Sequence, residues 1–132
     1  MSNRRVRVLL VDDHPAFLAM IEAELASLHQ LMIVGYAQSG REALKQVQQL
    51  QPDLVLLDIA MPDMNGLEVA RCIKAQLRPI VVVLVSLHDT LSYRSASASV
   101  ADGFVSKEML DIHLAPLIAR LFPGLPRHHG TS

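Results

Sequence analysis

The sequence predicts an α/β fold in which five strands alternate with five helices around one parallel sheet. Short apolar runs recur along the chain, and uninterrupted runs of this length are typical of strands buried on both faces. Each run is followed by a segment whose apolar residues are three or four positions apart, as on one face of a helix. Because crossovers between parallel strands are right-handed, we expect a doubly wound, flavodoxin-like sheet with strand order 2-1-3-4-5.

Composition limits the classes of protein to which the chain can belong. Its 132 residues suit one domain, and with 51% hydrophobic but only 4% aromatic residues the core must be aliphatic. A net charge of −1 without a basic cluster argues against direct nucleic-acid binding. The longest apolar run, 80–85, is too short to cross a bilayer, so we expect a cytoplasmic protein without membrane contact. The single Cys72 excludes an internal disulfide and a cysteine-based zinc cluster.

The first two strands are expected at residues 6–11 and 32–37. Pro15 suits the first turn of the helix between them. The expected buried face of that helix is Phe17, Ile21, Leu25 and Leu28. Ser39 with Glu42 three positions later is a capping box and starts the second helix. The expected buried stripe of the second helix is Ala43, Leu44, Val47 and Leu50.

The third strand, 54–57, runs directly into Asp58 and is followed by turn residues. Asn65 with Glu68 starts the third helix. Its expected buried face is Ala70, Ile73 and Leu77. The fourth strand is expected at 80–85, where β-branched residues dominate.

The helix expected at 90–99 is rich in serine, which competes for backbone hydrogen bonds, so it should be the softest helix. A fifth strand is expected at 104–106. Pro116 is awkward inside the last helix, which either begins near His113 or kinks at the proline. The expected buried face of the last helix is Leu114, Leu117, Ile118 and Leu121. Residues 1–122 should form the domain, and 123–132 a tail or the start of a linker.

The carboxyl ends of the predicted strands carry a set of polar residues that can act together. Asp12 and Asp13 end the first strand and Asp58 ends the third, and in the expected order these strands are neighbours about 4.8 Å apart. Carboxylates this close repel one another unless a cation lies among them, and Mg²⁺ suits oxygen ligands. Ser86 and Lys107, at the ends of the fourth and fifth strands, should point over the same edge.

This set outlines a site for phosphoryl transfer. A metal and an ammonium can neutralise a phosphoryl group, and one carboxylate can accept it as an acyl phosphate. We favour Asp58 as the nucleophile because it stands alone, whereas Asp12 and Asp13 form a pair suited to holding metal. Taken singly, each residue has an ordinary explanation as a helix cap, a turn residue or a surface lysine. His14 is expected at the rim of the pocket rather than on the metal.

With these residues in place, the chain resembles the receiver domain of bacterial two-component response regulators over roughly residues 5–121. The resemblance lies in the acidic opening at 12–15, in the loop 58–66 with its pattern D-x-x-M-P-x-x-x-G, in Ser86, and in the segment 101–107 that ends in Lys107. It implies that Asp58 accepts phosphate from a sensor histidine kinase or phosphotransfer protein.

The resemblance also implies a role for each remaining site residue. Asp13, Asp58 and the backbone carbonyl of Ala60 would bind Mg²⁺ directly, with Asp12 acting mostly through water. Ser86 and Lys107 would hold the phosphoryl oxygens. A further implied role is that Phe104 is the switch aromatic that follows Ser86 when the helix 4–strand 5–helix 5 surface changes. Ordinary core packing is the alternative explanation for this phenylalanine.

The motifs at 12–15 and 103–108 resemble the branch whose output domain is a LuxR-type helix-turn-helix, so an output domain, a partner protein or a homodimer is implied. Glu108 stands where many receivers have proline, which leaves the peptide geometry after Lys107 open. Two other functions stay open. One is a receiver-like interaction module that is never phosphorylated. The other is an enzyme, although no glycine-rich phosphate loop follows the first strand, and position 60 is alanine where aspartate-based phosphatases carry a second acid.

Overall fold

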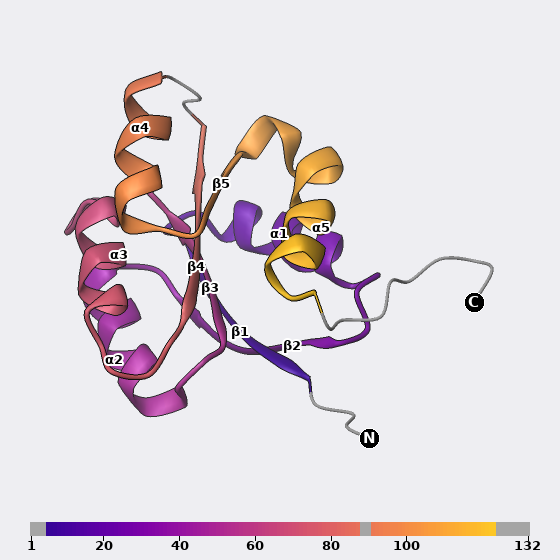
Figure 1. Cartoon of the computed structure of the whole chain (residues 1–132), viewed down its shortest axis with the longest axis horizontal. Coiled ribbons are helices and arrows are strands. Elements are labelled where there is room, and N and C mark those ends of the chain that lie inside the picture. The colour runs from indigo at the N-terminus through magenta and orange to yellow at the C-terminus, as the bar shows by residue number, and fades with distance from the viewer. Residues whose placement is uncertain (1–4, 88–90, 124–132) are drawn as a thin grey trace.

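The computed structural model describes residues 5–87 and 91–123, which form a five-stranded parallel sheet with helices on both faces (Figure 1). The strands are β1 (Val6–Val11), β2 (Leu31–Ala37), β3 (Leu54–Asp58), β4 (Val81–Ser86) and β5 (Gly103–Ser106), and their order is β2-β1-β3-β4-β5. All four pairings are parallel. The predicted sheet and its order are therefore confirmed, and each strand lies within one residue of its expected bounds.

The helices divide between the two faces of the sheet. α1 (Pro15–Leu25) and α5 (Leu110–Leu121) cover one face, and α2 (Gly40–Leu50), α3 (Gly66–Lys74) and α4 (Leu91–Val100) cover the other (Figure 1). Alternate residues of each central strand face opposite ways, so Leu10 packs with α1 and α5 while Leu9 packs with α2 and α3. Two cores, one on each face, explain why the strand sequences are continuously apolar.

Most of the expected helix faces are confirmed. Those of α2 and α5 pack as predicted, and in α3 Ala70 and Ile73 are fully buried. The prediction that Leu77 lies on that face is wrong. α3 ends at Lys74, and Leu77 lies in the following turn, where it is fully exposed. The apolar periodicity of the sequence continues past Lys74, although the helix ends there and the chain turns toward β4.

The face of α1 also differs from the prediction. Leu18, Ile21 and Leu25 are its buried residues, whereas Phe17 is only partly buried and turns toward the carboxyl edge of the sheet. The helix ends at Leu25, and Leu28 packs against the same core from the turn that follows.

The last helix begins at Leu110, after the short 3₁₀ turn η1 (Lys107–Met109), so a start near His113 is wrong. Pro116 lies inside α5 on its exposed side. No described peptide bond is cis, so the one after Lys107 is trans. The predicted tail lies outside the described residues apart from Pro123, as does Thr90 at the predicted start of α4.

Candidate functional site

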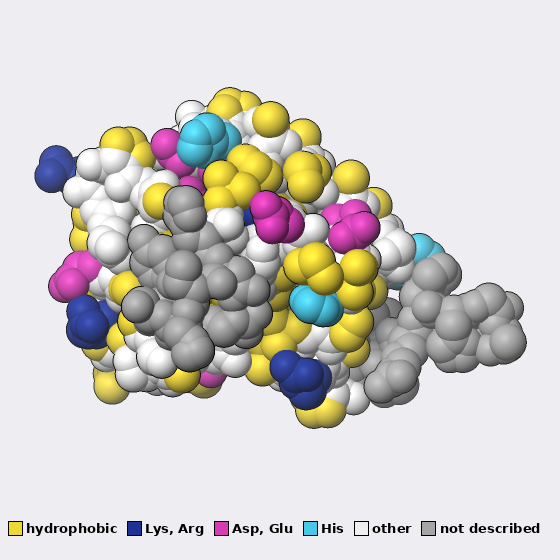
Figure 2. Space-filling model, turned by 90° about the horizontal axis from the view of Figure 1, so that it is seen from above, with side chains coloured by type: hydrophobic (Ala, Val, Ile, Leu, Met, Phe, Trp, Pro, Cys, Tyr) yellow, Lys and Arg dark blue, Asp and Glu magenta, His cyan; other side chains and the backbone are white. Residues whose placement is uncertain are grey.

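The five polar residues expected at one edge of the sheet are found there, Asp13 partly exposed and the other four buried. Asp12 directly follows β1, Asp58 ends β3, Ser86 ends β4 and Lys107 follows β5. None of these four residues is more than 3% exposed. Such burial is unusual for the charged residues Asp12, Asp58 and Lys107, and it is costly unless their charges are paired. Seen from above this edge, acidic side chains lie beside a histidine and apolar side chains (Figure 2).

Lys107 lies between two of the acids. Its Nζ is 2.7 Å from Asp12 Oδ2 and 3.5 Å from Asp58 Oδ1. The same ammonium lies 3.9 Å from the centroid of the Phe17 ring, within the range of a cation–π interaction. The aromatic face and the two carboxylates together hold one buried positive charge.

Asp58 is electrostatically strained when ionised. Burial, followed by the negative charge of Asp12, raises the pKa of Asp58 to about 6, while Lys107 and the Ala60 N–H, 3.4 Å from Oδ1, act in the opposite direction. One positive charge is not enough for the acids gathered here. Ionised Asp12, Asp13 and Asp58 leave negative charge that Lys107 alone does not balance.

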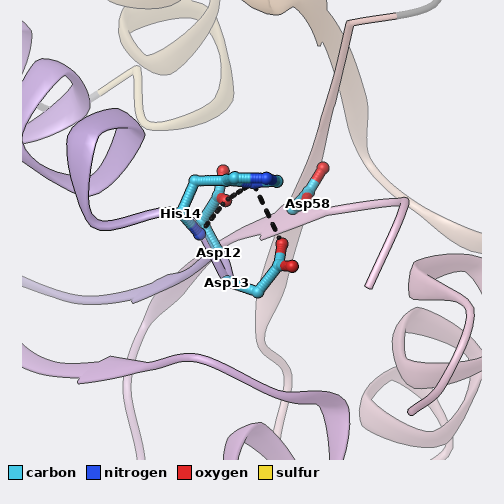
Figure 3. A group of neighbouring side chains, drawn as sticks. All are labelled: Asp12, Asp13, His14 and Asp58. Carbon is cyan, nitrogen blue, oxygen red and sulfur yellow. Dashed lines mark hydrogen bonds and ion pairs between the residues drawn. The ribbon is translucent and has the colours of Figure 1, made fainter. Parts of the chain in front are cut away.

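The acids and His14 form a group whose spacing suits a metal ion (Figure 3). One ligand atom from each of Asp12, Asp13, His14 and Asp58 lies within 4.8 Å of the others. Asp58 Oδ2 is buried and has no hydrogen-bond partner among the described residues. A buried carboxylate oxygen without a donor is costly, and a hard divalent cation would satisfy it. The donor set therefore fits Mg²⁺.

The loop after β3 is tied closely to the strand end. Gly66 N–H donates to Ile59 O at 2.7 Å, and Ala60 pairs with Asn65 in an isolated bridge. A Cβ at Gly66 would lie 2.5 Å from Ile59 Cα and still closer to the Asp58 carbonyl oxygen. Glycine is required here because the start of α3 packs directly on the backbone of Asp58.

The same loop also caps a distant helix. Asp63 accepts hydrogen bonds from the backbone N–H groups of Gly40 at 2.9 Å and Arg41 at 3.0 Å, in the first turn of α2. These donors lower the pKa of Asp63. A Cβ at Gly40 would lie 2.7 Å from Met64 Cβ, so the absence of a side chain allows the loop to approach the helix.

Comparison with known proteins agrees with this geometry. The family model for the response regulator receiver domain matches residues 8–119. The chain belongs to this family. Over 121 residues it is 36% identical to the response regulator GacA of Pseudomonas viridiflava, covering 90% of this chain and 56% of GacA. It is 45% identical over 95 residues to a protein-glutamate methylesterase/protein-glutamine glutaminase of Agrobacterium fabrum, covering 72% of this chain and 26% of that protein.

A solved structure gives the same result. The signal receiver domain of the response regulator NarL from Mycobacterium tuberculosis aligns with a TM-score of 0.83 and 30% identity, covering 92% of this chain and 98% of that one. The chain is thus the receiver domain of a two-component response regulator, a family in which phosphorylation of an aspartate is general. It spans about a quarter of the length of the methylesterase and little more than half of the length of GacA. Within the described part of the chain, no helix has the length and apolar character needed to span a membrane.

Ser86 and Phe104 lie on one face of this receiver's sheet. Leu84 pairs with Phe104 and Ser86 with Ser106, so Ser86 and Phe104 are diagonal neighbours on the face covered by α4. Phe104 is partly buried against the core on that face, which also includes Val100. Phe104 and the end of α4 therefore pack against the same core.

Two contacts at the site were not predicted from sequence. Phe17 was placed in the core because it fits a helical repeat, yet its ring covers Lys107. His14, expected at the rim, is 57% exposed but brings Nδ1 to 3.1 Å from Asp13 Oδ1. The sequence could have indicated both contacts. The two residues lie on either side of Pro15, at the start of the helix that follows the acidic pair, and the first turn of such a helix faces the carboxyl edge of the sheet.

Proposed function

We propose that Asp58 is the phosphoacceptor of this receiver domain. One observation carries the proposal: Asp58 is buried at the end of β3, beside a buried ammonium, with one carboxylate oxygen that no described donor reaches. Burial, followed by the negative charge of Asp12, raises the pKa of Asp58, which agrees with this placement. Exposed acids of the chain, such as Asp111, have no such surroundings.

In the proposed reaction, a carboxylate oxygen of Asp58 forms a bond to phosphorus. The bond from phosphorus to the donor breaks, and its electron pair leaves with the donor. Lys107, already 3.5 Å from Asp58 Oδ1, would pair with a phosphoryl oxygen, and the hydroxyl of Ser86 would donate to another.

We assign the metal to Asp13, Asp58 and the backbone carbonyl of Ala60, with Asp12 acting through water. Bound Mg²⁺ would neutralise charge on the phosphoryl oxygens. The spacing of the acids and the unpaired oxygen of Asp58 support this assignment. The assignment also agrees with the pairing of Lys107 with Asp12 rather than with Asp13.

Phosphorylation would act on the α4–β5–α5 surface through Ser86 and Phe104. A shallow groove of about 240 Å³ borders this surface and is lined by Phe104, His113, Pro116 and neighbouring residues of β5 and α5. We propose a sensor histidine kinase or phosphotransfer protein as the phosphate source, and a homodimer, a LuxR-type output domain or a partner protein as the recipient of the signal. Apart from assisting its own phosphorylation and dephosphorylation, the domain would not be an enzyme. Family membership supports a cytoplasmic location.

The test is to incubate the protein with a small-molecule phosphodonor and Mg²⁺ and to weigh it. The mass should increase by one phosphoryl group, and Asp58→Asn should abolish the gain. Asp111→Asn is the matched control, because Asp111 is an exposed acid in the first turn of α5 and should leave labelling intact. Absence of added mass in the wild type, or equal labelling of Asp58→Asn, would refute the assignment.

A further inference from the structure

We propose that His14 supplies an imidazole nitrogen to the metal site, so that the site binds transition dications such as Zn²⁺ and Co²⁺ through a ligand that Mg²⁺ does not use. The inference rests on the metal site of the proposed function and extends it from an all-oxygen to a mixed nitrogen and oxygen ligand set. The only assumption it shares with that function is that the acids hold a metal.

The backbone directs the His14 ring toward the acids. His14 is the residue before α1 and has extended dihedral angles, φ −109° and ψ 108°. Its backbone N–H donates to Asp12 Oδ1 at 2.9 Å. The ring meets the ring of Phe17 edge to face at 6.0 Å between centroids. In this position Nδ1 lies 3.1 Å from Asp13 Oδ1 and 3.3 Å from Asp12 Oδ1 (Figure 3).

Some carboxylate oxygens near His14 lack hydrogen-bond donors among the described residues. Asp13 Oδ1 is buried and has no hydrogen-bond partner among the described residues; His14 Nδ1 lies 3.1 Å away and forms an ion pair with it only when the imidazole is protonated. Asp58 Oδ2 is likewise buried and without a partner in the described part of the chain, in a residue that is 3% exposed. Buried acceptors of this kind are costly unless a donor or a cation faces them. A cation among Asp13, His14 and Asp58 would satisfy all three.

The spacing fits such an ion. Two ligands on neighbouring corners of a metal site lie roughly 3 to 3.5 Å apart when the metal–ligand bonds are about 2.1 Å. The 3.1 Å between Nδ1 and Asp13 Oδ1 falls in this range, and one ligand atom from each of the four residues lies within 4.8 Å of the others. Lys107 pairs with Asp12 Oδ2. On the side of the cluster that His14 faces, no lysine or arginine of the described residues pairs with the acids.

The chemistry of the ligands determines which dications bind more tightly when an imidazole is present. Mg²⁺ binds oxygen and keeps much of its water, so an imidazole adds little to its affinity. Zn²⁺ and Co²⁺ bind imidazole well, and an additional nitrogen ligand raises their affinity. His14 should therefore separate the two classes of dication, and only the binding of the transition metals should depend on it.

The experiment titrates metal-free protein with Zn²⁺, Co²⁺ and Mg²⁺ separately by calorimetry. The background carries His128→Ala and His129→Ala, which removes the tail imidazoles. His14→Ala should lower Zn²⁺ and Co²⁺ affinity about tenfold or more, while Mg²⁺ affinity changes by less than about twofold. His14→Asn is the second variant. Asparagine is a good residue at the start of a helix, so a loss of Zn²⁺ affinity in this variant does not come from unfolding. His29→Ala, at the other end of the α1 segment, is the matched control and should bind as wild type.

A spectroscopic measurement identifies the ligand directly. The Co²⁺-loaded protein should show a paramagnetically shifted ring N–H resonance that is lost in His14→Ala and retained in His29→Ala, His88→Ala and His113→Ala. Equal losses of Zn²⁺ and Mg²⁺ affinity in His14→Ala, or no loss of either, would overturn the inference. If the wild type binds no Mg²⁺ but binds Zn²⁺ through His14, the proposed Mg²⁺-dependent function fails and this inference stands.

Discussion

The ammonium of Lys107 lies 2.7 Å from Asp12 Oδ2, closer than the 3.5 Å that separates it from Asp58 Oδ1. In this state the lysine is held mainly by the neighbouring acid rather than by the residue that we propose as phosphoacceptor. The arrangement keeps the charge of Lys107 buried and compensated, and a phosphoryl group on Asp58 would compete with Asp12 for it.

Replacing Lys107 with methionine should strongly destabilise the metal-free protein. The ammonium and both carboxylates are almost fully buried, so removing it leaves buried acids without a cation, at a cost of about 3 to 5 kcal/mol in the free energy of unfolding. Urea unfolding in the presence of a chelator measures this, and added Mg²⁺ should restore part of the loss. Lys74→Met is the control. Lys74 also lies 2.8 Å from a carboxylate, that of Asp102, but both side chains are about one-third exposed, so a smaller effect is expected.

Asp58 should make the metal-free protein less stable as pH rises from about 4 to about 6. The pKa of Asp58 is raised in the folded state, so the folded protein holds this proton over a range in which the unfolded chain releases it. Stability from this group is complete below its ordinary pKa and is lost as pH rises through about 6. The total effect is at most about 3 kcal/mol. It is read as the difference in unfolding free energy between wild type and Asp58→Asn across pH, and parallel curves would contradict it.

Phe17 and Lys107 should be energetically coupled. Phe17→Leu keeps an apolar side chain but removes the aromatic face 3.9 Å from Nζ, and should cost about 0.5 to 2 kcal/mol. A double-mutant cycle with Lys107→Met isolates the interaction, because the cost of Phe17→Leu should largely vanish when the ammonium is absent. If the cost is the same in both backgrounds, Phe17 contributes only by packing.

Asp63→Ala should loosen the connection between α2 and the loop that follows β3. Amide hydrogen exchange at Gly40 and Arg41 should accelerate, because these N–H groups lose their acceptor. The pKa of Asp63 is lowered in the folded state, so its contribution to stability is present above its ordinary pKa and is lost as pH falls. Asp111→Ala, an exposed acid of α5, is the control and should leave exchange at both amides unchanged.

Gly66→Ala should displace the end of β3 and weaken both stability and phosphorylation. The added Cβ would meet backbone atoms of Asp58 and Ile59 that cannot move independently, so about 2 kcal/mol or more should be lost. At Gly103 the nearest atoms belong to the Leu117 side chain, 2.9 Å from the added Cβ, which can shift, so Gly103→Ala should be milder. Urea unfolding and phosphodonor labelling of the two variants check this order.

Local patterns were sufficient for the sheet and for the acids at its edge. Continuous apolar runs predict strands buried on both faces, and the parallel order brings Asp12 and Asp58 together because β1 and β3 are neighbours. Lys107 and Ser86 follow from the same rule. Their positions depend only on where each strand ends, and sequence determines that to within a residue.

Contacts that depend on how one element lies over another could not be predicted in this way. A helical repeat assigns Phe17 to the core, but in the folded protein its ring lies against Lys107. The same kind of repeat wrongly buried Leu77, because periodicity does not register that α3 has already ended. The bond from Asp63 to Gly40 joins residues 23 positions apart and has no local signature.

The five strands, their order, and the acids, lysine and serine at the carboxyl edge can all be predicted from the order of residues. The reason is that strand length, side-chain alternation and right-handed crossovers are local or nearly local constraints. Three further contacts become visible only in the folded protein: Lys107 with Asp12 and Phe17, His14 with Asp13, and Asp63 with the first turn of α2. Each of these contacts joins side chains whose meeting depends on the packing of whole helices and loops against the sheet, which no single segment of the chain encodes.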